Sequence, residues 1–406
     1  MPHPRTLLSV YPPNNFEEII TKQGPSQINI YVDLKNVMTS LFVPSVVEEI
    51  ALNSKNGTKL DSSIFQSVLF YCSWWRKYTQ KFQIPCQVFV STDLGRSVYH
   101  RQVYPGYKKS RDISNTSLTP YDAEFVEIRA KNSELADHFC KQIPNLHFYL
   151  LRYLEADFVP YWLMTRRFDD PNILHVLCSN DHDMYQAINK PNIFQLYKYR
   201  SEKRLLDYTT CLFDYLDIDK KSARMQEKNS DYIRRFNIGY IPAMMAVVGD
   251  PGDDVPGVTG IGPSKAVELF MDQNTVNELI GTPEELDERV ASGGMFLKSF
   301  DPNKDYGPWN KILTKQVKKH KFESNQEGFY DINTLITDSF KMISFEQLCR
   351  WLEKQECTEK IDWLKYMNLI TDKPLQNTIS TPGILATALA SLEDNYLTEQ
   401  DMEFLY

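Results

Sequence analysis

Short apolar runs alternate with longer amphipathic or polar segments through the first half of the chain. Five runs rich in β-branched and aromatic residues predict buried strands, and they lie at Ile28–Val32, Cys86–Val90, His147–Leu151, Ile173–Cys178 and Ile193–Tyr197. Between the first two runs, Ile64–Phe82 carries apolar residues at helical spacing. Strands that alternate with helices favour an α/β fold built on a mostly parallel sheet.

The second half of the chain has the spacing of helices. Ile241–Val248 is an unbroken apolar run, and Pro263 stands where a further helix would begin. Thr282–Ser292 predicts a short helix with Pro283 in its first turn, and Phe345–Gln355 is amphipathic. We therefore expect a helical region after the sheet.

Composition narrows the class of protein. The chain has 406 residues, of which 42% are hydrophobic and 13% aromatic, so it can bury a core large enough for two domains. No apolar run has the length of a membrane span, and Leu7–Val10 is too short for the core of a signal peptide. The seven cysteines show no C-x-x-C spacing, which favours reduced thiols over zinc or disulfides. We expect a cytoplasmic protein, neither secreted nor bound to a membrane.

Acidic residues stand at or just beyond the carboxyl ends of the predicted strands, where open α/β sheets place their ligands. These acids are Asp33, Asp93, Glu155, Asp157, Asp181 and Asp183. Simpler explanations exist, since Asp33 fits a helix N-cap and Asp93 a turn. Glu155 and Asp157 fit the favourable placement of acids at a helix start. The net charge of −8 disfavours a polyanionic partner unless metal ions neutralise part of it.

The stretch Val248–Ala266 combines two kinds of chemistry. Asp250 and Asp253 are about one turn apart and can reach one hard cation. Glycines for close backbone approach and a helix start follow, at Gly257, Gly260, Gly262, Pro263, Ser264 and Lys265. Free amides at such a helix start favour a phosphate group. A surface turn before an ordinary helix is the alternative.

Three stretches together resemble the 5′-nuclease superfamily, which includes flap endonucleases, the 5′-nuclease domain of bacterial DNA polymerase I, phage 5′ exonucleases and primer-removing ribonucleases H. Gly249–Gly262 resembles the helix–three-turn–helix pattern G-D-x-x-D-N-[IV]-P-G-[IV]-x-G-I-G, with Asp254 in place of asparagine. Ser179–Gln186 resembles S-x-D-x-D-x-x-Q, and Tyr104–Arg111 resembles Y-P-x-Y-K-x-x-R at the base of a helical arch. Residues 155–157 resemble E-A-D-D, whose last position is Phe158 here.

The resemblance implies a fold and a division of the chain. We expect a twisted, mostly parallel sheet of the PIN-like type, a helical arch at about residues 96–140, a helix–three-turn–helix element and a helical C-terminal region. The implied division is an N-terminal extension of weak order (1–27), an α/β nuclease core (28–215), a helix–three-turn–helix region (216–295), a helical region (296–371), and a linker with an acidic tail (372–406).

The resemblance also implies the chemistry, which is two-metal hydrolysis of a phosphodiester with Mg²⁺, for which Mn²⁺ can substitute. The first metal is expected at Asp33, Asp93, Glu155 and Asp157, and the second at Asp183, Asp250 and Asp253, with Asp181 near both. Lys108 and Arg111 would act with Asp181 on the scissile phosphate. Nucleic-acid contacts are expected from Arg96, Arg101, Lys109, Gly257, Gly260, Gly262, Ser264 and Lys265, with K⁺ bound at the glycine hairpin.

The implied function is cleavage near 5′ ends of DNA flaps or RNA primers during replication or repair, nearest to the phage-type enzymes. The acidic tail, Leu392–Tyr406, either binds a sliding clamp or single-strand-binding protein or packs on the body. Two rivals are a junction-resolving or repair endonuclease of the same superfamily and a non-catalytic DNA-binding scaffold. The scaffold predicts missing acids, and every expected acid is present.

Overall fold

The computed structural model describes residues 13–34, 36, 75, 79–94, 97–111, 145–152, 154–199, 202–216, 223–298, 301, 303–313 and 332–355. Within them, six strands form one sheet in the order β3-β2-β1-β4-β5-β6. The strands are β1 (Gln27–Asp33), β2 (Cys86–Leu94), β3 (Leu146–Arg152), β4 (Ile173–Cys178), β5 (Ile193–Tyr199) and β6 (Glu202–Leu206). All neighbouring pairs are parallel except β5 and β6, so the expected α/β class is confirmed.

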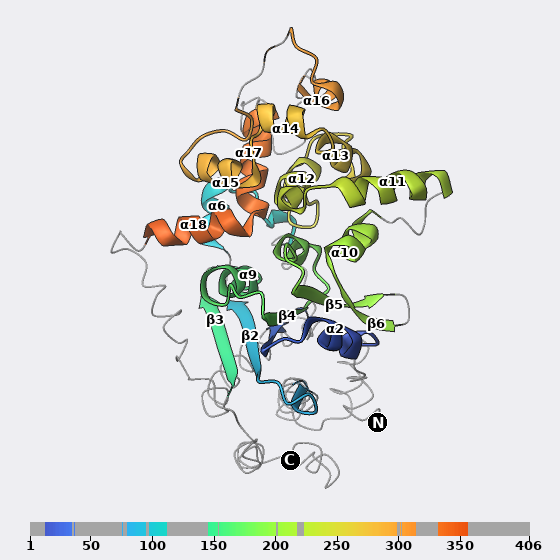
Figure 1. Cartoon of the computed structure of the whole chain (residues 1–406). Coiled ribbons are helices and arrows are strands. Elements are labelled where there is room, and N and C mark those ends of the chain that lie inside the picture. Colours follow the sequence, from blue (N-terminus) through green and yellow to red (C-terminus); the bar gives the residue numbers. More distant parts are fainter. Residues whose placement is uncertain are drawn as a thin grey trace, which may run out of the picture.

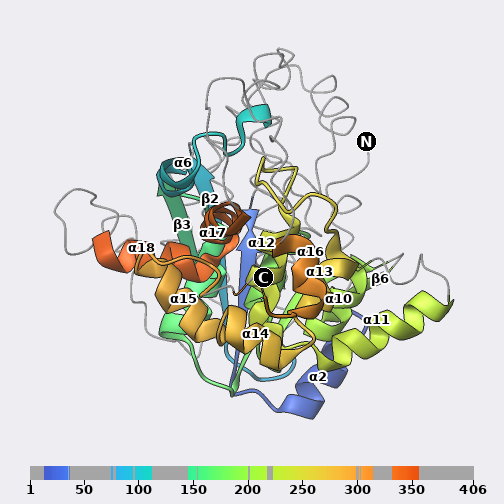
Figure 2. The ribbon, with the colours of Figure 1, turned by 90° about the horizontal axis from the view of Figure 1, so that it is seen from above.

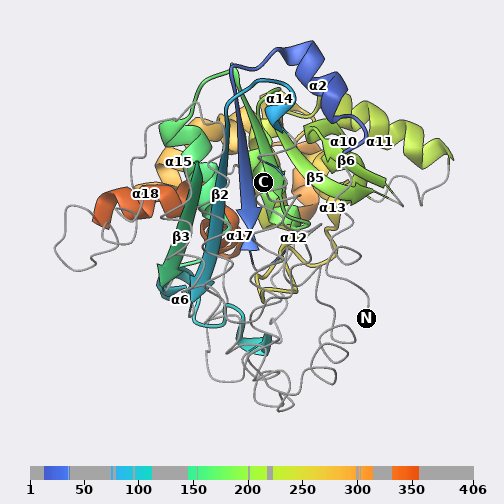
Figure 3. The same ribbon diagram turned by 90° about the horizontal axis from the view of Figure 1, so that it is seen from below.

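The centre of the sheet is apolar because β1 and β4 are covered on both faces. Ile30 of β1 pairs with Val88 of β2 on one side and with Val176 of β4 on the other. These three side chains share one face and are fully buried, and Tyr31, which points to the opposite face, is buried as well, as expected of parallel strands covered on both faces. Figure 3 shows β1 in the middle of the sheet.

The strand order creates a switch point beside β1. The chain runs outward from β1 to β2 and β3, and then returns to place β4 on the opposite side of β1. Loops after β1 and β4 therefore leave the same edge of the sheet in diverging directions. Crevices at such points are where α/β sheets bind ligands.

Helices gather on one side of the sheet, as Figure 1 shows. Near the sheet lie α6 (Val98–Val103), α9 (Phe158–Trp162), the π-helical turn η1 (Leu163–Arg167), the short helix η2 (His182–Ala187) and α10 (Tyr208–Tyr215). The second half adds α11 (Ala223–Arg235), η4 (Ile238–Tyr240), α12 (Ile241–Val248), α13 (Pro263–Leu269), α14 (Gln273–Leu279), α15 (Pro283–Ala291), η5 (Gly307–Trp309), α16 (Asn310–Leu313), α17 (Ile332–Ile343) and α18 (Phe345–Gln355).

Helix α12 is the core of this second half. Its apolar run explains its position, since Met244, Ala246 and Val247 are fully buried. It packs against α13 and α17, and Figure 2 shows α17 between α6 and α12. The apolar residues of the C-terminal helices thus form one continuous core with those of the sheet.

The N-terminal segment is more ordered than the sequence indicated. Residues Phe16–Gln23 form helix α2, and the Phe16 ring is fully buried, edge-on to Trp75 at 5.6 Å between ring centroids. The Asn15 side chain pairs with the backbone of Leu205 in β6: its amide donates to the carbonyl at 2.8 Å, and its oxygen accepts from the N–H at 2.9 Å. The expectation of weak order is therefore wrong for this helix, because its apolar face is buried in the body.

Several expectations concern residues outside the described ranges. They include the arch beyond residue 111, most of Ile64–Phe82 and the chain after residue 355. Among the described residues, Cys86, Cys178, Cys211 and Cys349 are buried free thiols, as expected for the cysteines. In the described part of the chain, no helix has the length and apolarity that crossing a membrane requires.

Candidate metal centre and nucleic-acid site

The loops after β1 and β4 bring acids together at the switch point. Asp33 ends β1, and its carboxylate accepts a hydrogen bond from the Ser179 hydroxyl at 3.3 Å, just after β4. Ser179 Oγ in turn accepts from the N–H of Asp181 at 3.1 Å. Asp181 then caps η2, with its carboxylate accepting from the N–H of Asp183 at 3.1 Å. These local bonds fix the loop so that its two aspartates share one end of the sheet.

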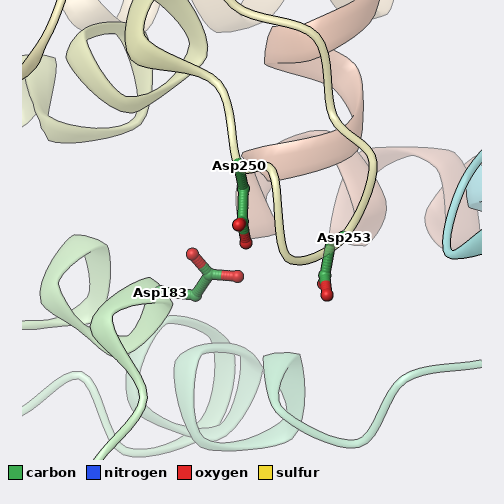
Figure 4. A group of neighbouring side chains, drawn as sticks. All are labelled: Asp183, Asp250 and Asp253. Atoms are coloured by element: carbon green, nitrogen blue, oxygen red, sulfur yellow. The ribbon is translucent and has the colours of Figure 1, made fainter. Parts of the chain in front are cut away.

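Three carboxylates meet in one cluster, which Figure 4 shows. Asp183, Asp250 and Asp253 each offer an oxygen, and these oxygens lie within 4.8 Å of one another. Asp250 and Asp253 descend from the turn after α12, which is closed by paired backbone bonds between Asp250 and Val255. The cluster therefore joins the sheet to the helical half. Three oxygens at this spacing fit a hard divalent cation.

Glu155 is tied to the cluster through the base of the expected arch. The Tyr107 hydroxyl lies 2.8 Å from Glu155 Oε2 and 3.2 Å from Asp253 Oδ2. The Lys108 ammonium forms ion pairs with Glu155 and, at 3.1 Å, with Asp253. The side chains of Lys108, Glu155 and Asp253 are nearly buried, with that of Lys108 only 10% exposed. A buried lysine between two carboxylates supplies a positive charge that the acids need.

The remaining expected cations lie in different surroundings. Arg111 forms an ion pair with Asp253 and donates from Nε to the Gly252 carbonyl at 3.1 Å. Lys109, on the same segment as Arg111, and Arg101, on α6, are both exposed. Arg96 lies outside the described residues. Both cations expected at the scissile phosphate thus face the acids directly.

The acids perturb one another electrostatically. Burial and then the neighbouring carboxylates of Asp181 and Asp250 raise the pKa of Asp183 well above its ordinary value. Burial, followed by the charge of Asp253, likewise raises the pKa of Asp250. Like charges in a desolvated site disfavour ionisation unless a cation is present. A divalent cation bound between Asp183 and Asp250 would therefore stabilise the ionised forms of both carboxylates.

Asp157 and Glu155 have opposite shifts. Burial, and then the charge of Glu155, raises the pKa of Asp157 well above its ordinary value. Burial opposes ionisation of Glu155 too, but the charge of Lys108 and the hydrogen bonds from Lys108 and Tyr107 outweigh that effect and lower its pKa to about 2. Asp93 lies in β2 opposite Leu151 of β3. Within the expected first metal site, Lys108 thus favours the ionised form of Glu155, whereas burial favours the protonated form of Asp157.

The glycine hairpin, residues 249–262, is shaped by its own packing. A Cβ at Gly257 would lie 1.9 Å from the Val248 carbonyl oxygen, so this glycine is required by the fold itself. Gly260 has a positive φ of 79°, and a Cβ at Gly262 would meet nothing within 4 Å. Lys265 folds back so that its ammonium donates to the Gly260 carbonyl at 2.9 Å. Gly260 and Gly262 are exposed, and contact of all three glycines with nucleic acid stays a prediction.

The sequence indicated no role for Tyr107, His100 or Ser110. Tyr107 was within reach of sequence reasoning because it precedes Lys108 in the motif, but no pattern marks His100. Asp254, which departs from the family pattern, accepts from the N–H of Ser110 at 2.8 Å and from its hydroxyl at 2.7 Å. The departure therefore ties the hairpin to the arch base.

Comparison with known proteins finds relatives of low similarity. No protein-family model matches it. It is 23% identical over 198 residues to DNA polymerase I of Streptococcus pneumoniae strain R6, a match that covers 47% of this chain and 18% of that protein. The enzyme of the serotype 4 strain matches to the same extent. The chain thus spans less than a fifth of the length of these relatives.

Solved structures align more distantly. The bacteriophage T5 D15 protein co-crystallised with metal ions aligns at 14% identity and a TM-score of 0.46, over 90% of this chain and 98% of that one. The catalytic core of Rad2 in complex with a DNA substrate aligns at 13% identity and a TM-score of 0.34, over 95% of this chain and 92% of that one. Structural likeness at this level says nothing about activity, whereas the sequence match agrees with the resemblance that the motifs indicate.

Proposed function

We propose that this chain is a divalent-metal-dependent 5′ nuclease that hydrolyses phosphodiesters near 5′ ends of DNA flaps or RNA primers in duplexes. The observation that carries the proposal is the meeting of Asp183 with Asp250 and Asp253 at the switch point of the sheet, beside the buried Lys108. An acidic floor with cations next to it suits a phosphate that gains negative charge during hydrolysis.

The donor set fits Mg²⁺, because every candidate ligand is a carboxylate oxygen. We assign one ion to Asp33, Asp93, Glu155 and Asp157, and a second to Asp183, Asp250 and Asp253, with Asp181 close to both. When bound, Mg²⁺ or Mn²⁺ would supply Lewis-acid stabilisation of charge on the phosphate and an activated water.

Lys108, Arg111 and Tyr107 would neutralise charge at the site and hold the acids in position. Lys108 and Arg111 compensate the acids in the absence of other cations, and both can turn to a phosphate oxygen once the acids are neutralised otherwise. Arg111 is suited to this because its side chain is 45% exposed. Tyr107 stays a donor, since burial raises the pKa of its hydroxyl, and it keeps Glu155 and Asp253 in place.

Duplex binding is assigned to the helix–three-turn–helix region. Backbone amides at Gly260, Gly262 and Ser264, together with Lys265, would hold one strand by its phosphates without reading sequence. We assign K⁺ to the same hairpin. We also propose the five-part division of the chain and a cytoplasmic location. The acidic tail, outside the described residues, either binds a sliding clamp or single-strand-binding protein or packs on the body.

Cleavage of labelled substrates tests the proposal. The full chain is incubated with a 5′-labelled flap duplex, an RNA-primed duplex and a four-way junction, in Mg²⁺ or in EDTA. We expect short 5′ products in Mg²⁺ alone, abolished in Asp181→Ala and Asp183→Asn.

Asp169→Asn is the control, because this exposed acid pairs with Lys190 just before β4, at the opposite end of the strands. Preferred cleavage of the junction would favour the resolvase alternative. Binding without cleavage in either Mg²⁺ or Mn²⁺ would refute the enzyme and favour the scaffold.

A further inference from the structure

Helix α17 ends against α6 and η2, and its last three carbonyls accept hydrogen bonds from side chains of these two elements. The last four carbonyls of an α-helix have no partner within the helix. In α17, the Phe340 carbonyl accepts from the N–H of Ser344 at 2.9 Å. The next three carbonyls accept from side chains of two other segments. Their partners determine what the helix end does.

Two of the partners come from α6, which leads to the arch base. The Tyr99 hydroxyl donates to the Lys341 carbonyl at 2.8 Å, and His100 Nε2 lies 2.9 Å from the Met342 carbonyl oxygen. A carbonyl only accepts, so Nε2 carries the proton and Nδ1 accepts from the Ser97 hydroxyl at 2.6 Å. Burial lowers the pKa of His100, in keeping with this neutral tautomer.

The third partner comes from η2, which follows the Asp181–Asp183 loop. Gln186 donates from Nε2 to the Ile343 carbonyl at 3.0 Å, and its Oε1 accepts from the N–H of Phe345 at 2.8 Å. The side chain therefore holds both sides of the junction between α17 and α18. It is buried, so water does not replace these bonds.

The contact with α6 reaches the acids through one stacked pair. The His100 ring lies parallel to the Tyr107 ring, with centroids 4.5 Å apart and planes inclined by 15°. Tyr107 in turn contacts Glu155 and Asp253 through its hydroxyl. The end of α17 thus touches both segments whose spacing defines the metal centre.

We propose that the C-terminal end of α17 sets the spacing between the arch base and the Asp181–Asp183 loop, with His100 and Gln186 as positioning residues for the metal ligands. The inference rests on the proposed function for its purpose, but the positions of these residues do not depend on cleavage. Partners that orient metal ligands typically contribute about ten- to a hundredfold to metal affinity.

The test separates hydrogen bonding from stacking. His100→Phe keeps a ring for Tyr107 and loses the bonds to Ser97 and Met342, while Gln186→Met releases η2. His147→Phe is the matched control. His147 is also buried, stacks on Phe89 at 4.7 Å and bonds to Gln87 at 2.9 Å, but it lies at the start of β3, away from Glu155.

Two readouts are measured on the full chain without nucleic acid. Mn²⁺ affinity is followed by electron paramagnetic resonance, and amide exchange of residues 104–111 is followed by mass spectrometry in EDTA. We expect His100→Phe and Gln186→Met to weaken Mn²⁺ binding about tenfold or more. We expect His100→Phe also to speed exchange in 104–111, and His147→Phe to change neither. His100→Gln, which keeps an N–H for Met342, should recover part of both losses.

The outcomes distinguish this inference from the proposed function. Unchanged Mn²⁺ affinity and exchange in His100→Phe would overturn the inference and leave the nuclease proposal standing. Equal effects in His147→Phe would also overturn it, because they would reflect general stability. Faster exchange in His100→Phe, in a chain that binds no Mn²⁺, would uphold the positioning and refute the metal-dependent function.

Discussion

Replacing Lys108 by methionine tests the electrostatic balance of the centre most directly. The change keeps the length of the side chain and removes its charge from between Glu155 and Asp253. Removing one partner of a buried ion pair costs about 3–5 kcal/mol. We expect the lower end, about 3 kcal/mol in EDTA, because Tyr107 still donates to these acids and Arg111 still pairs with Asp253.

A divalent cation should reverse most of this loss. In the unsubstituted chain a metal ion has to displace Lys108 from the acids, whereas in Lys108→Met it does not. We expect the difference in unfolding free energy to shrink by about 2 kcal/mol in saturating Mg²⁺, which corresponds to roughly thirtyfold tighter binding by the variant. Cleavage should nevertheless fall, because the phosphate loses a cation.

Urea unfolding in EDTA and in Mg²⁺ measures both quantities. Lys190→Met is the control, since this exposed lysine pairs with Asp169 at the surface and should change stability by less than about 1 kcal/mol. Equal stability of Lys108→Met and the unsubstituted chain in EDTA would refute the reasoning. So would a stability difference that Mg²⁺ leaves unchanged, because Lys108 and the metal would then not compete for the same acids.

Three further predictions concern the hairpin and the acids. Asp254→Asn should barely change the free energy of unfolding in urea, because its side-chain oxygen can still accept from Ser110 and asparagine tolerates the positive φ of 58°. Asp254→Ala should lower that free energy by about 2 kcal/mol, because two hydrogen bonds are lost. Equal effects of the two substitutions would contradict this. Gly257→Ala should lower thermal stability by about 3 kcal/mol or more through its clash with a carbonyl, while Gly262→Ala, with nothing within 4 Å, should be tolerated. The metal-free protein should lose stability as pH rises from about 4 toward the raised pKa of Asp183, because in this range the folded state retains a proton that the unfolded chain has released. Saturating Mg²⁺ should remove this pH dependence in unfolding experiments at several pH values. An increase of stability with pH in the metal-free protein would contradict the raised pKa.

The sheet was predictable because each strand carries its own local signal. Ile173–Cys178 is β4 to the residue, since its apolar and β-branched residues are buried on both faces. β2 extends to Leu94, beyond the apolar run, because its pairing with β3 continues through Leu94. Backbone pairing of that kind depends on the neighbouring strand and leaves no pattern in the sequence.

The site was predictable where a motif lies on one segment and hidden where two distant segments meet. The cluster of Asp183 with Asp250 and Asp253 follows from motifs that each stand at an element end. His100 has no such mark, because its partner, the carbonyl of Met342, is far away in the sequence. Gly257 shows a third case: the pattern indicates that a glycine is needed, but only the structure shows that the Val248 carbonyl requires it.

The pairing of Asn15 with Leu205 also bears on how one edge of the sheet is covered. In the part of the sheet that the structure describes, β6 is the edge strand, and the outward N–H and C=O groups of an edge strand offer a template for a strand of another molecule. The Asn15 amide occupies two of these groups in the manner of a peptide unit. Asn15, at the start of α2, thus blocks part of the edge against pairing with another molecule. Chains shortened past residue 23 should form β-rich aggregates during expression or refolding even if the metal centre is intact.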